Sequence, residues 1–384
     1  MNRSPMPTPR PIQAHRTISA CFFLCGFVFA TWAARIPSVK DAFRLDEGAL
    51  GTLLFMLPLG SILALPVAGW VIHRLGSRIV TTISLFLYSG LLVMLSLVDT
   101  LPTLSVILFL FGFVGDFLNI SMNTQGLTVQ HARGKPILSG LHAQWSFGAL
   151  TGAAFGGWTL RMAWPTQLHF SAVGLISVIP CLVMMRFLLP EPEKEPDRQV
   201  FRWPTSALWL LGIICFCNTM AEGAMADWSS LYYRQTLTDT AGVSTTGYVA
   251  FTLSMALGRL AGDRIIGWLG YRKTLMSNGL LIAGGLGFAL LWPEPAAVIT
   301  GFSAVGLGVS SVIPIAYMMA GRSRDMAPAA ALASVSAIGF TGFLIGPPLI
   351  GLIADASSLS WGLALVALLG IGITLFSLRV RSDL

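Results

Sequence analysis

The residues of this chain that could do chemistry are a few polar side chains inside long apolar runs. Each ionisable group among them costs roughly 2.5–3.5 kcal/mol on membrane-insertion scales, so these groups are the first candidates for a binding site. Asn119 and Asn123 follow Asp116 at +3 and +7, which places a carboxylate and two amides on one face of a helix. This combination suits a hydroxyl-rich or amine-bearing ligand. The alternative is a stripe that hydrogen-bonds to a neighbouring helix, at about 0.6 kcal/mol per contact.

Glu222 is the second candidate, because it lies well inside another apolar run, one turn beyond Asn218. Burial away from water favours the protonated form of a carboxyl group, which is what a proton-coupling site needs. We expect Glu222 to carry the proton, with Asp116 as a second proton-coupling candidate. The alternative is a fixed hydrogen bond or an ion pair with Arg35 or Arg259.

Two kinds of aromatic ring complete the candidate set. His142 titrates near neutrality and could relay protons, although a histidine satisfied by its own helix backbone is equally consistent with the sequence. Trp32 and Trp228 lie near the ends of two runs, where an interfacial belt or stacking against a sugar ring would each explain them. The predicted substrate-binding residues are Asp116, Asn119, Asn123, His142, Gln144, Asn218, Trp32 and Trp228.

Composition indicates which elements must position these residues. The chain has 384 residues, of which 54% are hydrophobic and 11% charged, whereas a soluble domain carries about 25% charged residues. Apolar runs of roughly 20 residues match a hydrocarbon core about 30 Å thick. The sequence predicts an all-α integral membrane protein with twelve transmembrane helices, near 17–35, 49–72, 79–98, 103–126, 137–160, 167–189, 205–230, 244–264, 273–292, 296–320, 329–354 and 359–380.

The positive residues predict the orientation of these helices. Nineteen lysines and arginines fall on the side of the two termini and five on the opposite side, which puts both termini in the cytoplasm. This membrane pattern also explains the net charge of +7 without nucleic acid as a partner.

The twelve runs divide into two related halves. Residues 190–204, PEPEKEPDRQVFRWP, read as a cytoplasmic linker between six-helix bundles at 1–189 and 205–384. Seven glycines recur at one offset of 194 residues, among them the pairs Gly112 with Gly306 and Gly148 with Gly342. Transporters built from parallel repeats bind substrate near the midplane between their halves and expose it to each side in turn.

Residues 69–78, GWVIHRLGSR, together with the six-plus-six plan, resemble the major facilitator superfamily. The corresponding superfamily motif has an acid where His73 stands, and the copy at 267–273, GWLGYRK, also lacks one, although Asp263 lies one turn earlier. The resemblance implies a gating role for a set of charged residues on the cytoplasmic side: Arg74, Arg78, Asp263 and Arg272. On the opposite side we expect Asp227 to tie an extracellular gate with Arg35.

Within the superfamily the chain resembles the YbjJ-like branch of bacterial inner-membrane proteins. The segments that carry this resemblance are WAARIP at 32–37, SMNTQG at 121–126, HAQWS at 142–146 and AEGAMADW at 221–228. The branch implies an acid where Asn119 stands here, so a proton site is not carried over to that position.

Other classes of function lack their signatures. No glycine-rich loop ends in Gly-Lys-Ser/Thr, which argues against an ATP-driven pump, and no cluster has metal-ligand spacing, so we expect neither an enzyme nor a cofactor or metal. The five cysteines lie in apolar runs and read as small buried hydrophobic residues. The glycines of 148–156 are interpreted as a helix-packing face.

These observations predict a secondary transporter, proton-coupled and monomeric, for a small polar solute such as a sugar or a related metabolite. One alternative is proton-antiport efflux of drugs or metabolites, which an aromatic- and methionine-lined cavity with a single acid would favour. Another is a membrane sensor that does not transport.

Overall fold

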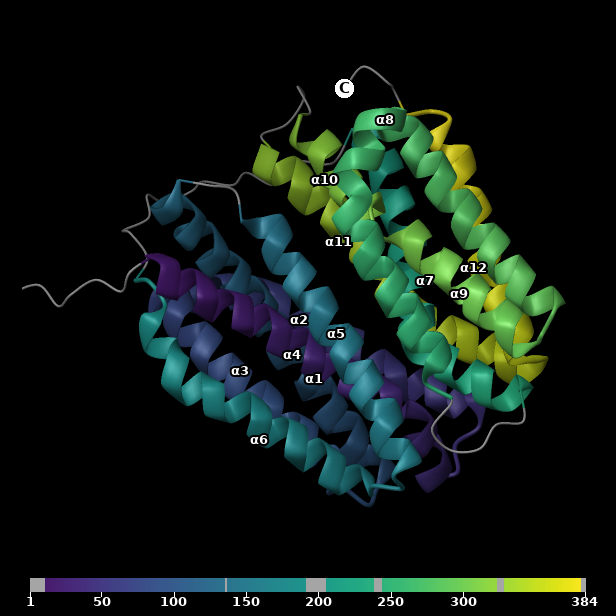
Figure 1. The fold of residues 1–384 in the computed structure, drawn as a ribbon, viewed down its shortest axis with the longest axis horizontal. Coiled ribbons are helices and arrows are strands. Elements are labelled where there is room, and N and C mark those ends of the chain that lie inside the picture. Colours follow the sequence, from purple (N-terminus) through teal and green to yellow (C-terminus); the bar gives the residue numbers. More distant parts are fainter. Residues whose placement is uncertain (1–10, 135–136, 191–204, 238–243, 323–327, 381–384) are drawn as a thin grey trace, which may run out of the picture. The chain divides into compact units, whose positions relative to one another are not determined.

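The regular secondary structure is all helical in the part of the chain described by the computed structural model, residues 11–134, 137–190, 205–237, 244–322 and 328–380. Its helices, drawn in Figure 1, are α1 (Pro11–Ala42), α2 (Glu47–Leu75), α3 (Ser77–Met94), α4 (Leu101–Arg133), α5 (Leu138–Arg161), α6 (Thr166–Met184), the 3₁₀ turn η1 (Met185–Phe187), α7 (Ser206–Thr236), α8 (Thr246–Leu291), α9 (Pro295–Val309), α10 (Val312–Gly321), α11 (Pro328–Ala356) and α12 (Leu359–Ser377).

Each of the twelve predicted runs coincides with helix, which confirms the predicted fold class. The runs 244–264 and 273–292 are joined in α8, with a kink at Gly270, and the run 296–320 is divided into α9 and α10 at Ser310 and Ser311. Among the described residues, nine helical stretches are long and apolar enough to cross a membrane. The protein is therefore a multi-pass membrane protein.

The helix ends follow local sequence rules. Asp46 precedes α2, and its Oδ1 accepts a hydrogen bond from the backbone N–H of Ala49 at 2.7 Å. Pro102 lies in the first turn of α4, where its missing N–H costs nothing. At the other end of α4, Gly134 takes a left-handed conformation with φ 63° and donates its N–H to the carbonyl of Gln130 at 3.0 Å.

The helices form two compact groups. The first group contains Met1–Trp32, Met56–Gly152 and Trp164–Pro196, and the second contains Ala33–Phe55, Ala153–Ala163 and Asp197–Leu384. The second group thus includes the C-terminal end of α1, the beginning of α2 and the end of α5. The division into bundles at 1–189 and 205–384 stays a prediction, and the predicted linker lies outside the described residues except for Pro190.

Glycines allow pairs of helices to touch backbone to backbone within the first group. A Cβ atom on Gly148 would overlap the carbonyl oxygen of Phe23, so α5 crosses α1 at that point. A Cβ on Gly112 would overlap the carbonyl oxygen of Leu57, which marks the crossing of α4 and α2. The interpretation of the α5 glycines as a packing face agrees with these contacts.

The second group repeats the same crossings at the 194-residue offset. Gly342 meets the carbonyl oxygen of Phe216 where α11 crosses α7, and Gly306 meets that of Phe251 where α9 crosses α8. The glycine repeat in the sequence is therefore a repeat of helix crossings.

Candidate functional site

The polar stripe of α4 brings three predicted residues together in the first group. The Asn123 side-chain amide donates to the Asn119 backbone oxygen at 2.8 Å and to its Oδ1 at 3.1 Å. The Asn119 side chain in turn hydrogen-bonds to the carboxyl group of Asp116. Asp116 is 9% exposed, and its Oδ2 has no hydrogen-bond partner within the described part of the chain. The stripe thus ends in a buried carboxyl group with one oxygen unused.

Helix α1 lies next to this stripe, and α5 packs against α1. Cys25 of α1 is within electrostatic range of Asp116 and hydrogen-bonds to Trp145 of α5. A Cβ on Gly26 would overlap the carbonyl oxygen of Trp145, so glycine is what allows α5 to come this close. No local pattern pointed to Cys25, because its place beside Asp116 depends on how three helices pack.

A cavity of about 500 Å³ opens between α1 and α5 in the same group. Of the predicted residues it is lined by Gln144, and sequence reasoning missed His15, Arg16 and Ser19 because they lie before or at the start of the first apolar run. His15 Nδ1 lies 2.6 Å from Arg133 Nη1.

His142 is exposed, and its ring meets the edge of Phe22 at a centroid distance of 5.3 Å. Its backbone oxygen accepts a hydrogen bond from Ser146. A relay role for this ring stays a prediction.

In the second group, Glu222 of α7 pairs with Arg259 of α8. Arg259 Nη2 lies 3.4 Å from Glu222 Oε1, and the two side chains are 21% and 14% exposed. Asn218, one turn before Glu222, is fully buried, and neither its amide nitrogen nor its oxygen has a partner among the described residues. Ion pairing with Arg259 was one of the alternatives that the sequence left open.

Asp227 and Arg35 also belong to the second group. Asp227 and Glu222 are both within electrostatic range of the buried Tyr248, a residue that sequence reasoning missed. Arg35 is 3% exposed and donates from Nη2 to Thr159 Oγ1 at 3.1 Å. A tie between Arg35 and Asp227 stays a prediction.

The two candidate tryptophans are fully enclosed. Trp32 is 1% exposed and Trp228 is 0% exposed, whereas Trp268 is 89% exposed. An interfacial belt alone would leave such rings at the surface, so burial favours a role inside the protein. In both rings the indole nitrogen has no acceptor within the described ranges.

The residues of the 69–78 motif are placed at the ends of helices. Arg74 is exposed and stacks over Trp70 at 4.9 Å, and Arg78 donates to the carbonyl oxygen of Arg186 at 3.3 Å. Gly76 and its repeat partner Gly270 have φ of 78° and 73°, a conformation that suits glycine.

The copy of this motif is described only in part. Arg272 is half-buried, and the side chain of Asp263 lies outside the described residues.

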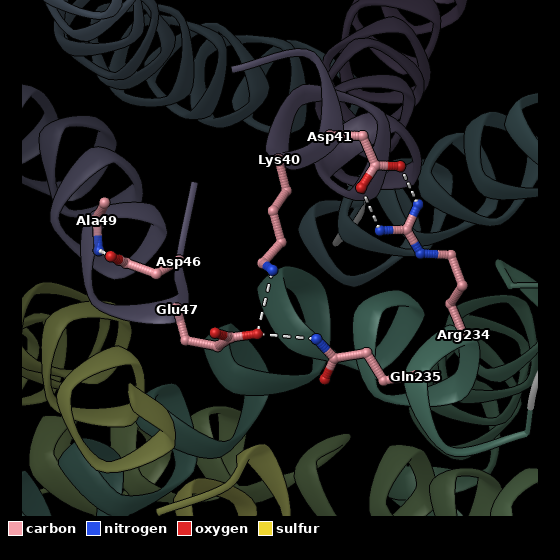
Figure 2. A network of polar contacts seen from close by, with 7 residues as sticks. All are labelled: Lys40, Asp41, Asp46, Glu47, Ala49, Arg234 and Gln235. Carbon is pink, nitrogen blue, oxygen red and sulfur yellow. Dashed lines mark hydrogen bonds and ion pairs between the residues drawn. The ribbon is translucent and has the colours of Figure 1, made fainter. Parts of the chain in front are cut away.

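A polar network joins the ends of α1 and α7 and the beginning of α2 in the second group (Figure 2). Arg234 donates to both carboxylate oxygens of Asp41, at 2.5 and 2.8 Å. Glu47 Oε1 accepts from Gln235 at 2.8 Å and lies 3.1 Å from Lys40 Nζ. Sequence reasoning used Lys40 and Arg234 only to count loop charges, because a pairing between residues so distant in the chain has no local pattern. We call these five residues the helix-end network.

Comparisons with known proteins identify the family of the chain. The model of the Major Facilitator Superfamily matches residues 18–325. An uncharacterised MFS-type transporter of Yersinia pestis is 34% identical over 352 residues, 91% of this chain and 91% of that protein. Membrane protein MosC of Rhizobium meliloti is 32% identical over 367 residues, 94% of this chain and 88% of that protein.

A solved structure has the same fold. A mutant form of the nucleoside transporter NupG superposes with a TM-score of 0.79 at 13% sequence identity, and the match covers 96% of this chain and 99% of that one. The likeness at this identity concerns the fold. From the family match and the relatives together, the chain belongs to the Major Facilitator Superfamily and is a membrane transporter.

Proposed function

We propose that this protein is a secondary active transporter that moves a small polar solute, sugar-like or a related metabolite, by alternating access. It works as a proton-coupled monomer of the YbjJ-like branch in the bacterial inner membrane, with both termini in the cytoplasm. The observation that carries the proposal is the α4 stripe, whose buried carboxyl group retains an unused oxygen beside two amides. Buried polar groups are normally hydrogen-bonded, so a buried acceptor without a protein partner is a candidate contact for a polar solute.

The choice of a polar solute is also supported by other polar side chains among the described residues. The cavity of about 500 Å³ has the volume of a small-molecule site and is lined in part by Ser19 and Gln144. Asn218 offers a second buried amide without a partner in the described part of the chain. These groups would exchange hydrogen bonds with hydroxyls, and Trp32 and Trp228 would contact the apolar face of a ring.

The proton-coupling role of Glu222 follows from its pairing. A proton on Glu222 removes the charge that holds the Arg259 guanidinium at 3.4 Å, so protonation would free Arg259 to change partner. Loss of the proton on the other side of the membrane would restore the pair. Asp116 remains the second proton-coupling candidate.

Gating is proposed for charged residues near the helix ends. Arg35 and Asp227 would close one side of the transporter, and Arg74, Arg78, Asp263 and Arg272 would close the other. The helix-end network adds a further group of charges that ties α1 and α2 to α7.

The proposal is tested by a screen of small polar solutes with the purified protein. A ligand that binds the folded state raises the apparent melting temperature, by an amount that grows with concentration over the dissociation constant. We expect one or more polar solutes to stabilise the protein and to enter proteoliposomes that contain it. If only apolar cationic drugs did so, efflux would replace this proposal.

A further inference from the structure

Asp116 is a carboxyl group whose charge is not compensated by any basic side chain that the described residues contribute. It is 9% exposed, and its Oδ2 lacks a hydrogen-bond partner there. The ion pairs found in the described part of the chain involve Glu47, Asp41 and Glu222 instead. An ionised carboxylate without a partner is costly to bury, so the site stabilises a group that brings positive charge to it.

The amides of the stripe point their donors towards this carboxyl group. Asn123 donates to Asn119 Oδ1, so Asn119 has its own amide N–H left to give to Asp116. A carboxylate has only acceptors, which agrees with the direction of this chain. Asn119 is thereby held in one orientation, and the atom left for a ligand at the buried end is Asp116 Oδ2, an acceptor.

Glu222 provides an internal contrast. It lies in a membrane helix as Asp116 does, yet Arg259 is 3.4 Å from its Oε1. The pair at Glu222 already has a fixed positive partner, whereas Asp116 has an acceptor atom left for one. Protonation of Glu222 would break its ion pair with Arg259. Asp116, in contrast, suits a positively charged group that is part of the solute.

We propose that Asp116 binds the primary ammonium group of the transported solute, so that the substrate is a hydroxylated amine. The Asp116 Oδ2 atom accepts a hydrogen bond from one of the three N–H groups of the ammonium. The side chains of Asn119 and Asn123 form hydrogen bonds with neighbouring hydroxyls of the same molecule. This assignment rests on the proposed function and names the substrate class of that site.

The basic residues of the cavity do not oppose this assignment. Arg16 lies nine residues before Cys25, the α1 residue close to Asp116, and this spacing amounts to roughly 13 Å along a helix. None of the ion pairs found among the described residues joins Arg16 to Asp116.

The test compares solutes that differ in one group. Binding to the purified full-length protein is measured by calorimetry for glucosamine, N-acetylglucosamine and glucose, and for a set of amino alcohols with their matching polyols. We expect the amine of at least one set to bind roughly tenfold or more tightly than its hydroxyl counterpart, because a charged hydrogen bond is lost in the latter. Asp116→Asn should remove this preference.

Two further variants keep the test decisive. Asp116→Glu retains the charge and should keep the preference for the amine. Asp116→Asn should still bind the hydroxyl solutes, which excludes loss of folding as the cause of its lost preference. Asp99→Asn removes an exposed carboxyl group to which no role in binding or gating is assigned, and it should leave the ratio between amine and hydroxyl solutes unchanged.

Several outcomes would overturn the inference. They are equal or tighter binding of the hydroxyl solutes, an amine preference that survives in Asp116→Asn, or binding of no amine in the set. Transport of a neutral polar solute in the same preparation would leave the proposed function intact while contradicting the amine assignment. Only the absence of any polar substrate would contradict both the proposed function and the amine assignment.

Discussion

At the scale of single residues, the carboxyl groups inside the membrane helices have unequal surroundings. Glu222 has Arg259 beside it, and Asp116 has two amides aligned towards it. Asp227 lies within electrostatic range of Tyr248, as Glu222 does. The same chemical group thus pairs with a guanidinium at Glu222, accepts a hydrogen bond from an amide at Asp116, and lies within electrostatic range of a phenol at Asp227. This difference is the reason for assigning the proton to Glu222 and the solute to Asp116.

The assignment of Glu222 predicts the effect of removing its partner. Arg259→Met leaves a carboxyl group without a counter-charge, and breaking such a pair costs about 3 kcal/mol when it is buried and less for partly exposed side chains. We expect the melting temperature to fall in Arg259→Met and to recover in the double variant Glu222→Gln/Arg259→Met, because the double variant removes both charges. Equal melting temperatures for the single variant and the unmodified protein would show that the pair contributes nothing.

At the scale of helices, the two groups share their crossings and differ in their polar centres. Asp116 corresponds to Ser310 at the 194-residue offset, and Ser310 lies where the helical run is interrupted between α9 and α10. Ser311 accepts a hydrogen bond from the Asn278 side chain at 2.8 Å, so a polar bond between helices stands at this break. Interrupted helices in transporters are typical of substrate sites, and the sequence repeat relates this break to the α4 stripe.

The helix-end network predicts a second outcome at this scale. Arg234 bonds Asp41 through two parallel hydrogen bonds, with the side chains 27% and 60% exposed (Figure 2). Exposed pairs contribute at most about 1 kcal/mol, so we expect a small effect on stability. If the pair holds the end of α1 at the end of α7 during transport, Arg234→Asp should slow solute exchange, and the swapped variant Asp41→Arg/Arg234→Asp should restore it.

Asp99→Arg serves as the control for this experiment, because it reverses the charge of another exposed acid at a helix junction. It should leave the rate of exchange close to that of the unmodified protein. Failure of the swapped variant to recover any of the rate lost in Arg234→Asp would contradict the role of the pair.

At the scale of the whole molecule, hydropathy and spacing were sufficient for the helices and for residues that share one helix. Asp116, Asn119 and Asn123 were predicted together because a helical period alone puts them on one face. The pairing of Glu222 with Arg259 remained one of several alternatives, since the sequence does not say which helices touch.

The features that sequence reasoning missed depend on packing or on backbone geometry. Hydropathy divided α8 correctly around the kink at Gly270, but it joined α9 to α10 because it does not report the backbone break at Ser310 and Ser311. Tyr248, Cys25 and the helix-end network are defined by contacts between distant segments. The burial of Trp32 and Trp228 is of the same kind, because interfacial and enclosed tryptophans have similar sequence surroundings.

Proton-coupled transport is tested most directly by solute uptake into proteoliposomes under an imposed pH gradient. With the acidic side outside, the unmodified protein should accumulate its solute above the equilibrium level, because protons moving inward drive it. Glu222→Gln should still exchange solute between the two sides but should no longer accumulate it, since its amide carries no titratable proton. Uptake by the unmodified protein that is equal with and without the pH gradient would contradict the account.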